Sequence, residues 1–183
     1  MKKSATNTKV QKEQKQNGEV MLGGIVSLAM YGKRSFVNGK SDKEDKYRLS
    51  LKVNEATLEK LRFVAEPYYA DVEDKWMPDW LKKDMSEFDG EDIFLNFASA
   101  YDFPVGEYID GELHPLGTFG ELLEKNGNIN GSKVIASITI KTGALYPRAL
   151  IIKELHKQDI TSIFGEDNSI IENLIEDENP FDD

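Results

Sequence analysis

The sequence predicts a mainly β protein with small helices, arranged as a five-stranded barrel of the OB type. Short stretches in which apolar and polar residues alternate recur along the chain, and such alternation is typical of half-buried strands. Their order is a bent strand, a second strand, an extra helix, a strand region, a short helix and two final strands. A helix before the last two of five strands fits this Greek-key barrel. A generic α+β sandwich would give nearly the same pattern and stays open as an alternative.

The first two strands are predicted from their apolar patterns. Residues 20–31 are largely apolar and contain the pair Gly23-Gly24. Such a pair inside a strand indicates a bulge, a bend or a close backbone approach, and a strand shared between two parts of a barrel needs a bend. Residues 46–53 alternate, with apolar side chains on one face and a polar, mainly basic outer face of Lys46, Arg48, Ser50 and Lys52.

An acidic insertion is predicted in the middle of the chain. Asn54 can cap a helix that starts at Glu55, and Glu66-Pro67 is expected to end that helix. Residues 66–112 hold fourteen acidic and three basic side chains, and we interpret this range as the insertion. Within it, residues 92–98 and 105–109 have the patterns of strands, and residues 78–85 have the pattern of a short helix.

The last part of the barrel is predicted as a helix followed by a hairpin. Thr118-Phe-Gly-Glu121 matches a capping box, which indicates a short helix that ends near Asn126-Gly127. Residues 133–141 alternate cleanly, and the turn Thr142-Gly143 leads into a second apolar strand over residues 145–155. These two strands are expected to pair as a hairpin.

The charge of the chain is unevenly distributed. Over 183 residues, 33 acidic and 23 basic side chains give a formal net charge of −10. From Ile160 onward there are eight acidic residues and no Lys or Arg, so the preceding chain is close to neutral. We therefore predict a disordered basic arm over residues 1–18, an OB-like domain over residues 19–158 and an acidic flexible tail over residues 159–183.

Several function classes lack their sequence signals. The chain has no cysteine, which excludes disulfides and thiolate metal sites. It has no P-loop and no Gly-x-Ser-x-Gly elbow, and His114 and His156 lack metal-ligand spacing. We therefore expect no catalysis, metal or cofactor. No apolar run reaches the roughly 20 residues that span a bilayer, and residues 1–16 lack the apolar stretch of a signal peptide, so a soluble, cytoplasmic protein without membrane partners is expected.

Basic and aromatic side chains are interleaved on the predicted strands. Lys and Arg can contact phosphates, and aromatic rings can stack on unpaired bases. In a barrel these strands are neighbours, so their side chains could converge on one surface, although each one alone fits a core or solubilising role as well. The candidate DNA-binding residues are Tyr31, Lys33, Arg34, Phe36, Lys46, Tyr47, Arg48, Lys52, Lys141, Tyr146, Arg148 and Lys153. Trp76 and Trp80 lie in the acidic stretch, where a core or partner-surface role is expected.

The acidic tail carries an apolar pair near its end. Pro180-Phe181 lies between acidic residues, and such a segment can fill a partner's pocket while its charges attract basic proteins. The candidate partner-binding residues are Asp177, Glu178, Pro180, Phe181, Asp182 and Asp183.

Together, the barrel pattern, the basic and aromatic strands and the acidic terminus with Pro180-Phe181 resemble a single-stranded-DNA-binding protein of bacteriophage replication and recombination. The resemblance covers residues 134–155 and the tail best. It implies an OB body that coats and protects unpaired DNA in replication, recombination or repair, in the host cytoplasm if phage-encoded, and a tail that recruits partner proteins. In bacterial members the motif ends in Pro-Phe, whereas here Asp182 and Asp183 follow it. Self-association stays open.

Two other classes of function stay open. An acidic DNA mimic or inhibitor would occupy a basic groove on a protein partner, which the net charge of −10 and the acidic range 66–112 favour. The near-neutral body with basic strands argues against it. A carboxylate-metal nuclease is the third option, because carboxylate clusters can hold two metal ions.

Overall fold

The computed structural model describes residues 17–34 and 43–156 of the chain. Nearly all of the predicted basic arm, the candidate residue Phe36 and the predicted acidic tail with Pro180-Phe181 lie outside the described residues.

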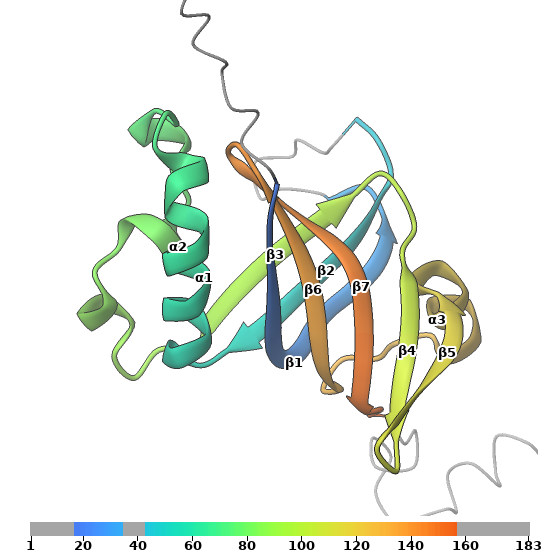
Figure 1. Ribbon diagram of the computed structural model, residues 1–183. Helices are drawn as coiled ribbons and strands as arrows, with labels where there is room; N and C mark the ends of the chain where they lie inside the picture. Colours follow the sequence, from blue (N-terminus) through green and yellow to red (C-terminus); the bar gives the residue numbers. More distant parts are fainter. Residues whose placement is uncertain (1–16, 35–42, 157–183) are drawn as a thin grey trace, which may run out of the picture.

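The described strands form a single seven-stranded sheet, and the mainly β class is confirmed (Figure 1). Along the sheet the strand order is β3-β2-β1-β6-β7-β4-β5. All neighbours are antiparallel except β4 and β7, which run parallel. The strands are β1 (Gly18–Gly32), β2 (Lys46–Val53), β3 (Ile93–Ser99), β4 (Pro104–Ile109), β5 (Glu112–Thr118), β6 (Lys133–Lys141) and β7 (Ala144–Glu154).

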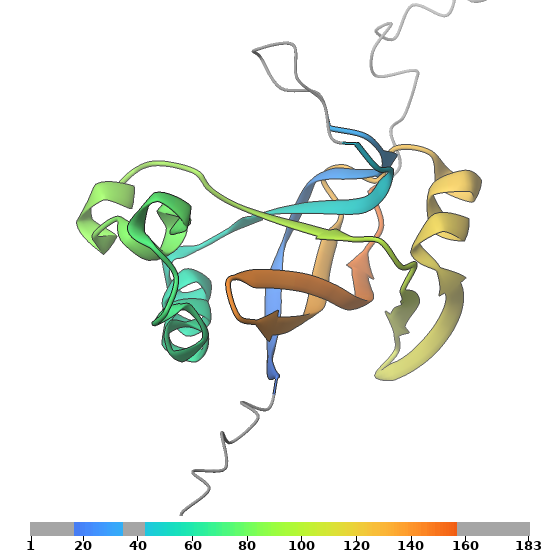
Figure 2. The ribbon, with the colours of Figure 1, turned by 90° about the horizontal axis from the view of Figure 1, so that it is seen from above.

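The sheet is strongly curled but is not closed, so the predicted five-stranded barrel is not confirmed. β3 and β4 follow each other in the chain but lie at distant places in the sheet order, and residues 100–103 link them. β3 lies next to β7 across the curl, without a ladder between them in the described residues. Figure 2 shows this curl from above, with α1 (Glu55–Tyr69) and α2 (Asp79–Lys82) on one side and α3 (Phe119–Asn126) on the other.

β1 bends because it serves both halves of the sheet. Its residues 18–25 pair with β6, and its residues 25–32 pair with β2, with a register shift between Val26 and Leu28. At the bend the backbone approach is close, since a Cβ on Gly24 would lie 2.8 Å from the carbonyl oxygen of Lys52. The glycine pair therefore marks a real bend, as predicted.

The core lies inside the curl. The predicted inward faces of β2, β3 and β6 are buried, and Leu49, Leu95 and Ile138 are examples. α1 contributes Leu58, Leu61 and Ala65 from one flank. α3 contributes Phe119 and Leu122 from the other flank, and its predicted capping box is present because Thr118 accepts from the backbone of Glu121.

Two elements differ from the sequence predictions. α1 continues past Pro67 to Tyr69, because the buried Tyr69 ring packs edge-on against Trp80 at 5.5 Å and holds the last turn in place. β5 was not predicted, since it is exposed along almost its whole length and therefore lacks the alternation of a half-buried strand. The range 66–112 contains the end of α1, α2, short 3₁₀ helices, all of β3 and β4, and the start of β5.

Candidate nucleic-acid interface

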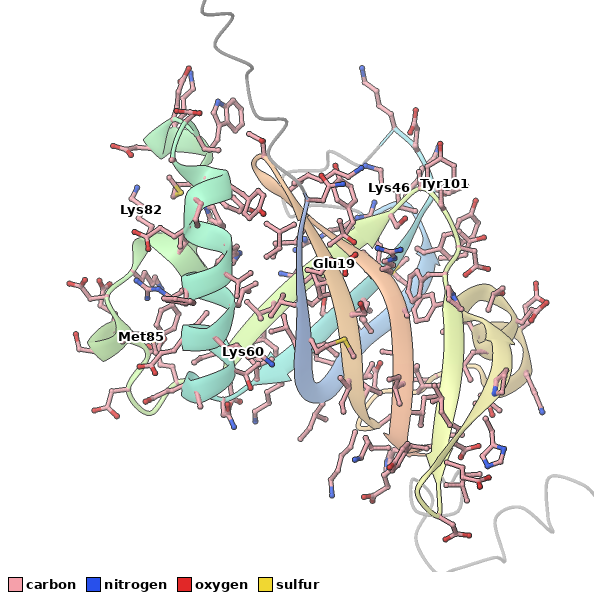
Figure 3. All side chains as sticks on the ribbon, in the orientation of Figure 1. Glu19, Lys46, Lys60, Lys82, Met85 and Tyr101 are labelled. Carbon is pink, nitrogen blue, oxygen red and sulfur yellow. The ribbon has the colours of Figure 1, made fainter. Side chains whose placement is uncertain are left out.

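A cleft of about 430 Å³ opens between the β3–β4 link and the β6–β7 hairpin. We call it the tyrosine cleft, because Tyr101 and Tyr146 line it with exposed fractions of 81% and 39%. Figure 3 shows Tyr101 at the end of the sheet where the β3–β4 link lies. The cleft is lined by Ser99, Ala100, Tyr101, Asp102, Phe103, Thr139, Lys141, Tyr146, Pro147 and Arg148.

The hairpin brings three of the predicted residues into this cleft. Tyr146 lies opposite Thr139 in the register, and the Lys141 ammonium lies 5.4 Å from the Tyr146 ring centroid. Arg148 follows on the same strand and forms an ion pair with Glu19 of β1. A lysine over a tyrosine ring leaves the ammonium within reach of an anion while the other ring face can accept a flat apolar group.

The aromatic residues Tyr31 and Tyr47 lie beside the cleft. Their ring centroids are 4.5 Å apart, and Tyr47 also packs edge-on against Phe119 at 6.4 Å. Tyr47 lies opposite Ser99, which lines the cleft. Partial burial raises the pKa of Tyr47, with smaller contributions from Asp102, Tyr31 and Glu124. Tyr47 therefore belongs mainly to the packing, whereas 54% of Tyr31 is exposed.

A second hollow lies on the outer face of β1, β2 and β3, and we call it the arginine hollow. It has a volume of about 260 Å³ and contains two predicted residues, Arg34 and Arg48. Arg48 is only 9% exposed and donates from Nε to the carbonyl oxygen of Gly32, 3.1 Å away. The other residues that line the arginine hollow are Leu28, Ser50, Asn96, Phe97 and Ala98.

A third hollow of about 540 Å³, which we call the lysine groove, lies at the bend of β1. It gathers Lys52, Lys133 and Lys153 from three strands. Lys52 and Lys133 lie opposite Ile25 on its two sides, which explains their convergence. Lys52 pairs with Asp92 at 2.7 Å and Lys133 pairs with Glu154 at 3.0 Å, and the Lys153 ammonium lies 5.0 Å from the Tyr108 ring centroid.

The predicted residues therefore fall into neighbouring groups rather than one patch. Lys141, Tyr146 and Arg148 share the tyrosine cleft, Arg34 and Arg48 the arginine hollow, and Lys52 and Lys153 the lysine groove. Lys46 is half-buried opposite Gly32, and Lys33 is exposed just after β1.

Sequence reasoning missed Tyr101, Asp102 and Lys133. Tyr101 and Asp102 lie in the range interpreted as an insertion, and the signal that could have found Tyr101 is an aromatic residue three positions after the predicted strand over residues 92–98. Lys133 is the first residue of β6 and belongs to the outer face of its alternating pattern. The sequence pattern therefore already implied that this side chain is exposed. Asp102 accepts from the backbone N–H groups of Phe103 and Gly120, so it positions α3 beside the cleft.

Charge is segregated between the helices and the strands. Residues 55–92, which we call the helical flank, carry twelve carboxylates and five basic side chains. The other described residues carry ten carboxylates and eleven basic side chains. The cleft, the hollow and the groove therefore belong to a nearly neutral body with locally clustered cations.

No protein-family model matches this sequence, and no curated protein matches it either. In residues 17–34 and 43–156, no group of three or more His, Asp or Glu side chains is arranged to hold a metal ion. None of the helices in the described part of the chain combines the length and apolar composition needed to cross a membrane.

Proposed function

We propose that this protein binds single-stranded DNA through the tyrosine cleft, the arginine hollow and the lysine groove. The observation that carries the proposal is the pairing of exposed Tyr101 and Tyr146 with Lys141 and Arg148 in one cleft. Unpaired bases stack on aromatic rings with little sequence preference, and each stacked base contributes about 1–3 kcal/mol. In duplex DNA the base faces are stacked on one another, so they are not available to stack on the tyrosine rings of this cleft.

The DNA backbone follows a path from the cleft along β2 and β3 to the bend of β1. Ala98 of the arginine hollow and Ser99 of the tyrosine cleft are consecutive residues at the end of β3, and their side chains point to opposite faces of the sheet, so the proposed path turns around this strand end. Ser50 lines the arginine hollow and Lys52 the lysine groove, two residues further along β2. Cations along this path contact successive phosphates.

The OB-type architecture belongs to the same proposal. If β3 and β4 are counted as one strand that is interrupted at residues 100–103, the neighbours of this strand are β2 on one side and β7 on the other. With the β1–β2, β1–β6 and β6–β7 pairs, the result is a five-stranded ring, which β5 extends as a side hairpin. In the OB-fold, the face of strands 2 and 3 binds oligonucleotides, and here that face contains the arginine hollow.

In this role the protein coats and protects unpaired DNA during replication, recombination or repair in the cytoplasm. The acidic tail with Pro180-Phe181 recruits other replication or recombination proteins. The binding chemistry uses stacking and charge, so it requires no catalysis and no cofactor.

The rival function is an acidic mimic that binds a basic groove on a protein. The excess of carboxylates on the helical flank favours it. The function of such a mimic requires no exposed tyrosines beside lysine and arginine. Its negative surface charge would repel nucleic acids of every kind.

A salt series of binding measurements with oligo-dT and with duplex DNA tests the proposal. We expect oligo-dT to bind much more tightly than the duplex, with an affinity that falls as salt rises. The double substitution Lys141→Ala and Lys52→Ala should lower the salt slope by roughly 0.7 for each lost phosphate contact. Lack of binding to both DNAs would favour the mimic, and degradation of DNA in magnesium would favour a nuclease.

A further inference from the structure

The helical flank exposes two large aromatic side chains. Phe63 of α1 is 84% exposed and Trp76 is 72% exposed. Neither supports the core: the α1 side chains that are buried against the sheet are Leu58, Leu61, Ala65 and Tyr69. A hollow of about 520 Å³ with Phe63 in its lining lies between α1 and the segment that follows it.

Carboxylates lie beside this aromatic surface, together with the cations Arg62 and Lys82 of the same hollow. Glu66 and Asp74 line the hollow, and Glu73 lies next to it and pairs with Lys75 at 2.7 Å. The Lys75 ammonium also lies 5.6 Å from the Trp76 ring centroid, so the surface already holds one lysine by a carboxylate and an aromatic ring together. Further lysines fit this chemistry, because their ammonium groups pair with carboxylates while their aliphatic stems cover aromatic rings.

The chain itself carries such lysines in the segment that precedes β1 in the sequence. Residues 1–16 contain five lysines and one glutamate. They are attached where β1 begins, and a Cβ on Gly18 would lie only 2.7 Å from the Tyr68 ring of α1. Figure 1 shows the start of β1 beside the last turns of α1. Sixteen residues span up to about 50 Å when extended, which is longer than α1 at about 1.5 Å per residue.

We propose that residues 1–16 dock on the helical flank of the same chain, with their lysines against the carboxylates and the exposed rings of Phe63 and Trp76. The tether keeps these lysines near the flank at an effective concentration that can reach the millimolar range, so weak individual contacts suffice. Docking neutralises part of the flank charge and covers its aromatic side chains. This inference requires no nucleic acid and is independent of the proposed function.

The test is a paramagnetic label on the full chain. The sequence has no cysteine, so Ala5→Cys provides a single attachment site for a nitroxide. We expect amide signals around Phe63 and Trp76 to lose at least half their intensity at low salt. These signals should recover in about 1 M salt, where the Debye length is about 3 Å.

Two charge variants serve as a matched pair. Neutralising the flank by Glu66→Gln, Glu73→Gln and Asp74→Asn should abolish the broadening. Neutralising three carboxylates of the β4–β5 hairpin by Glu107→Gln, Asp110→Asn and Glu112→Gln should leave it unchanged. Broadening that is absent at low salt, or equal in both variants, would overturn the proposal. A mixture of an isotope-labelled copy without nitroxide and an unlabelled copy with nitroxide tests for docking between copies. Broadening in this mixture as strong as in the singly labelled chain would show that the arm docks on a second copy, and it would also overturn the proposal.

Discussion

At the scale of single residues, the side chain with the clearest functional signature is Tyr101. Its ring is 81% exposed, so its burial stabilises the fold little. Its backbone is nevertheless fixed, because its N–H donates to the Ser99 hydroxyl at 3.0 Å. An aromatic ring on an ordered backbone loses little conformational entropy when it stacks on a base.

Tyr101→Ala should therefore weaken oligo-dT binding by about 1–3 kcal/mol without lowering the melting temperature. The matched control is Leu113→Ala, which shortens an exposed apolar side chain of β5 that lies outside both the cleft and the helical flank. Fluorescence anisotropy titrations compare the affinities, and thermal denaturation compares the stabilities. Equal oligo-dT affinities for the two variants would show that Tyr101 does not contribute to DNA binding.

The buried Tyr69 makes a separate prediction about pH. Burial raises the pKa of Tyr69 to about 12, with a smaller contribution from Tyr146, whereas an unfolded tyrosine titrates near 10. Between these two values the folded protein binds more protons than the unfolded chain, so stability falls as pH rises through this window. The full effect amounts to roughly 1.4 kcal/mol per pKa unit.

Tyr69→Phe keeps the ring that packs on Trp80 and removes the titrating hydroxyl. Urea denaturation from about pH 8 to about pH 11 should show a shallower loss of stability for this variant than for the wild type. Identical pH slopes would mean that other groups account for the alkaline loss.

At the scale of elements, β1 organises the molecule because one strand takes part in both halves of the sheet. The two glycines at its bend are not equivalent. A Cβ on Gly23 would meet nothing within 4 Å, whereas a Cβ on Gly24 would lie 2.8 Å from the Lys52 carbonyl oxygen and 3.2 Å from Leu51 and Val53 atoms. The second glycine is therefore required by the close approach of β2.

Gly24→Ala should destabilise the fold by about 1–3 kcal/mol, the usual cost of overpacking a tight site. Gly23→Ala should be close to neutral and is the matched control. Denaturant melts of both variants give the comparison. A neutral Gly24→Ala would show that β1 and β2 can separate at the bend without cost.

Elements with strong local signals were predictable from the sequence. Alternation gave β2, β3 and β6, the Thr142-Gly143 turn gave the hairpin, and the capping box at Thr118 gave α3. Two features depend on contacts that are distant in sequence and were not predictable. These are the last turn of α1, which Trp80 holds, and the parallel pairing of β4 with β7.

The same distinction explains the candidate site. Lys141, Tyr146 and Arg148 were predictable as a group because one hairpin carries them. Tyr101 reaches the cleft only because the chain turns between β3 and β4 and β3 lies next to β7. No local pattern encodes that turn. Burial of Arg48 likewise follows from the way β1, β2 and β3 pack, not from the basic character of β2.

At the scale of the whole molecule, charge divides the chain into regions of different character. The strands and α3 form a nearly neutral body with clustered cations, and the helical flank has a clear excess of carboxylates. Residues 166–183, outside the described part of the chain, add eight carboxylates and no Lys or Arg. Because β7 lines the tyrosine cleft and ends shortly before this segment, the anionic tail is tethered to the strand that carries part of the proposed site.

This arrangement predicts competition between the tail and DNA. A tethered polyanion can be present near the cationic cleft at an effective concentration in the millimolar range. Its attraction is strongest at low ionic strength, where screening is weak. DNA binding would then displace the tail and make Pro180-Phe181 accessible to partner proteins, so that recruitment depends on whether DNA is bound.

Deleting residues 166–183 should accordingly tighten oligo-dT binding at low salt, and the gain should shrink as salt rises, because the same screening weakens the tail's hold on the cleft. The full chain and the deletion variant are compared by titration across one salt series. Equal affinities at every salt would show that the tail does not reach the cleft. Weaker binding by the deletion variant would show that the tail contributes to the DNA site, since a competitor cannot strengthen the binding that it opposes.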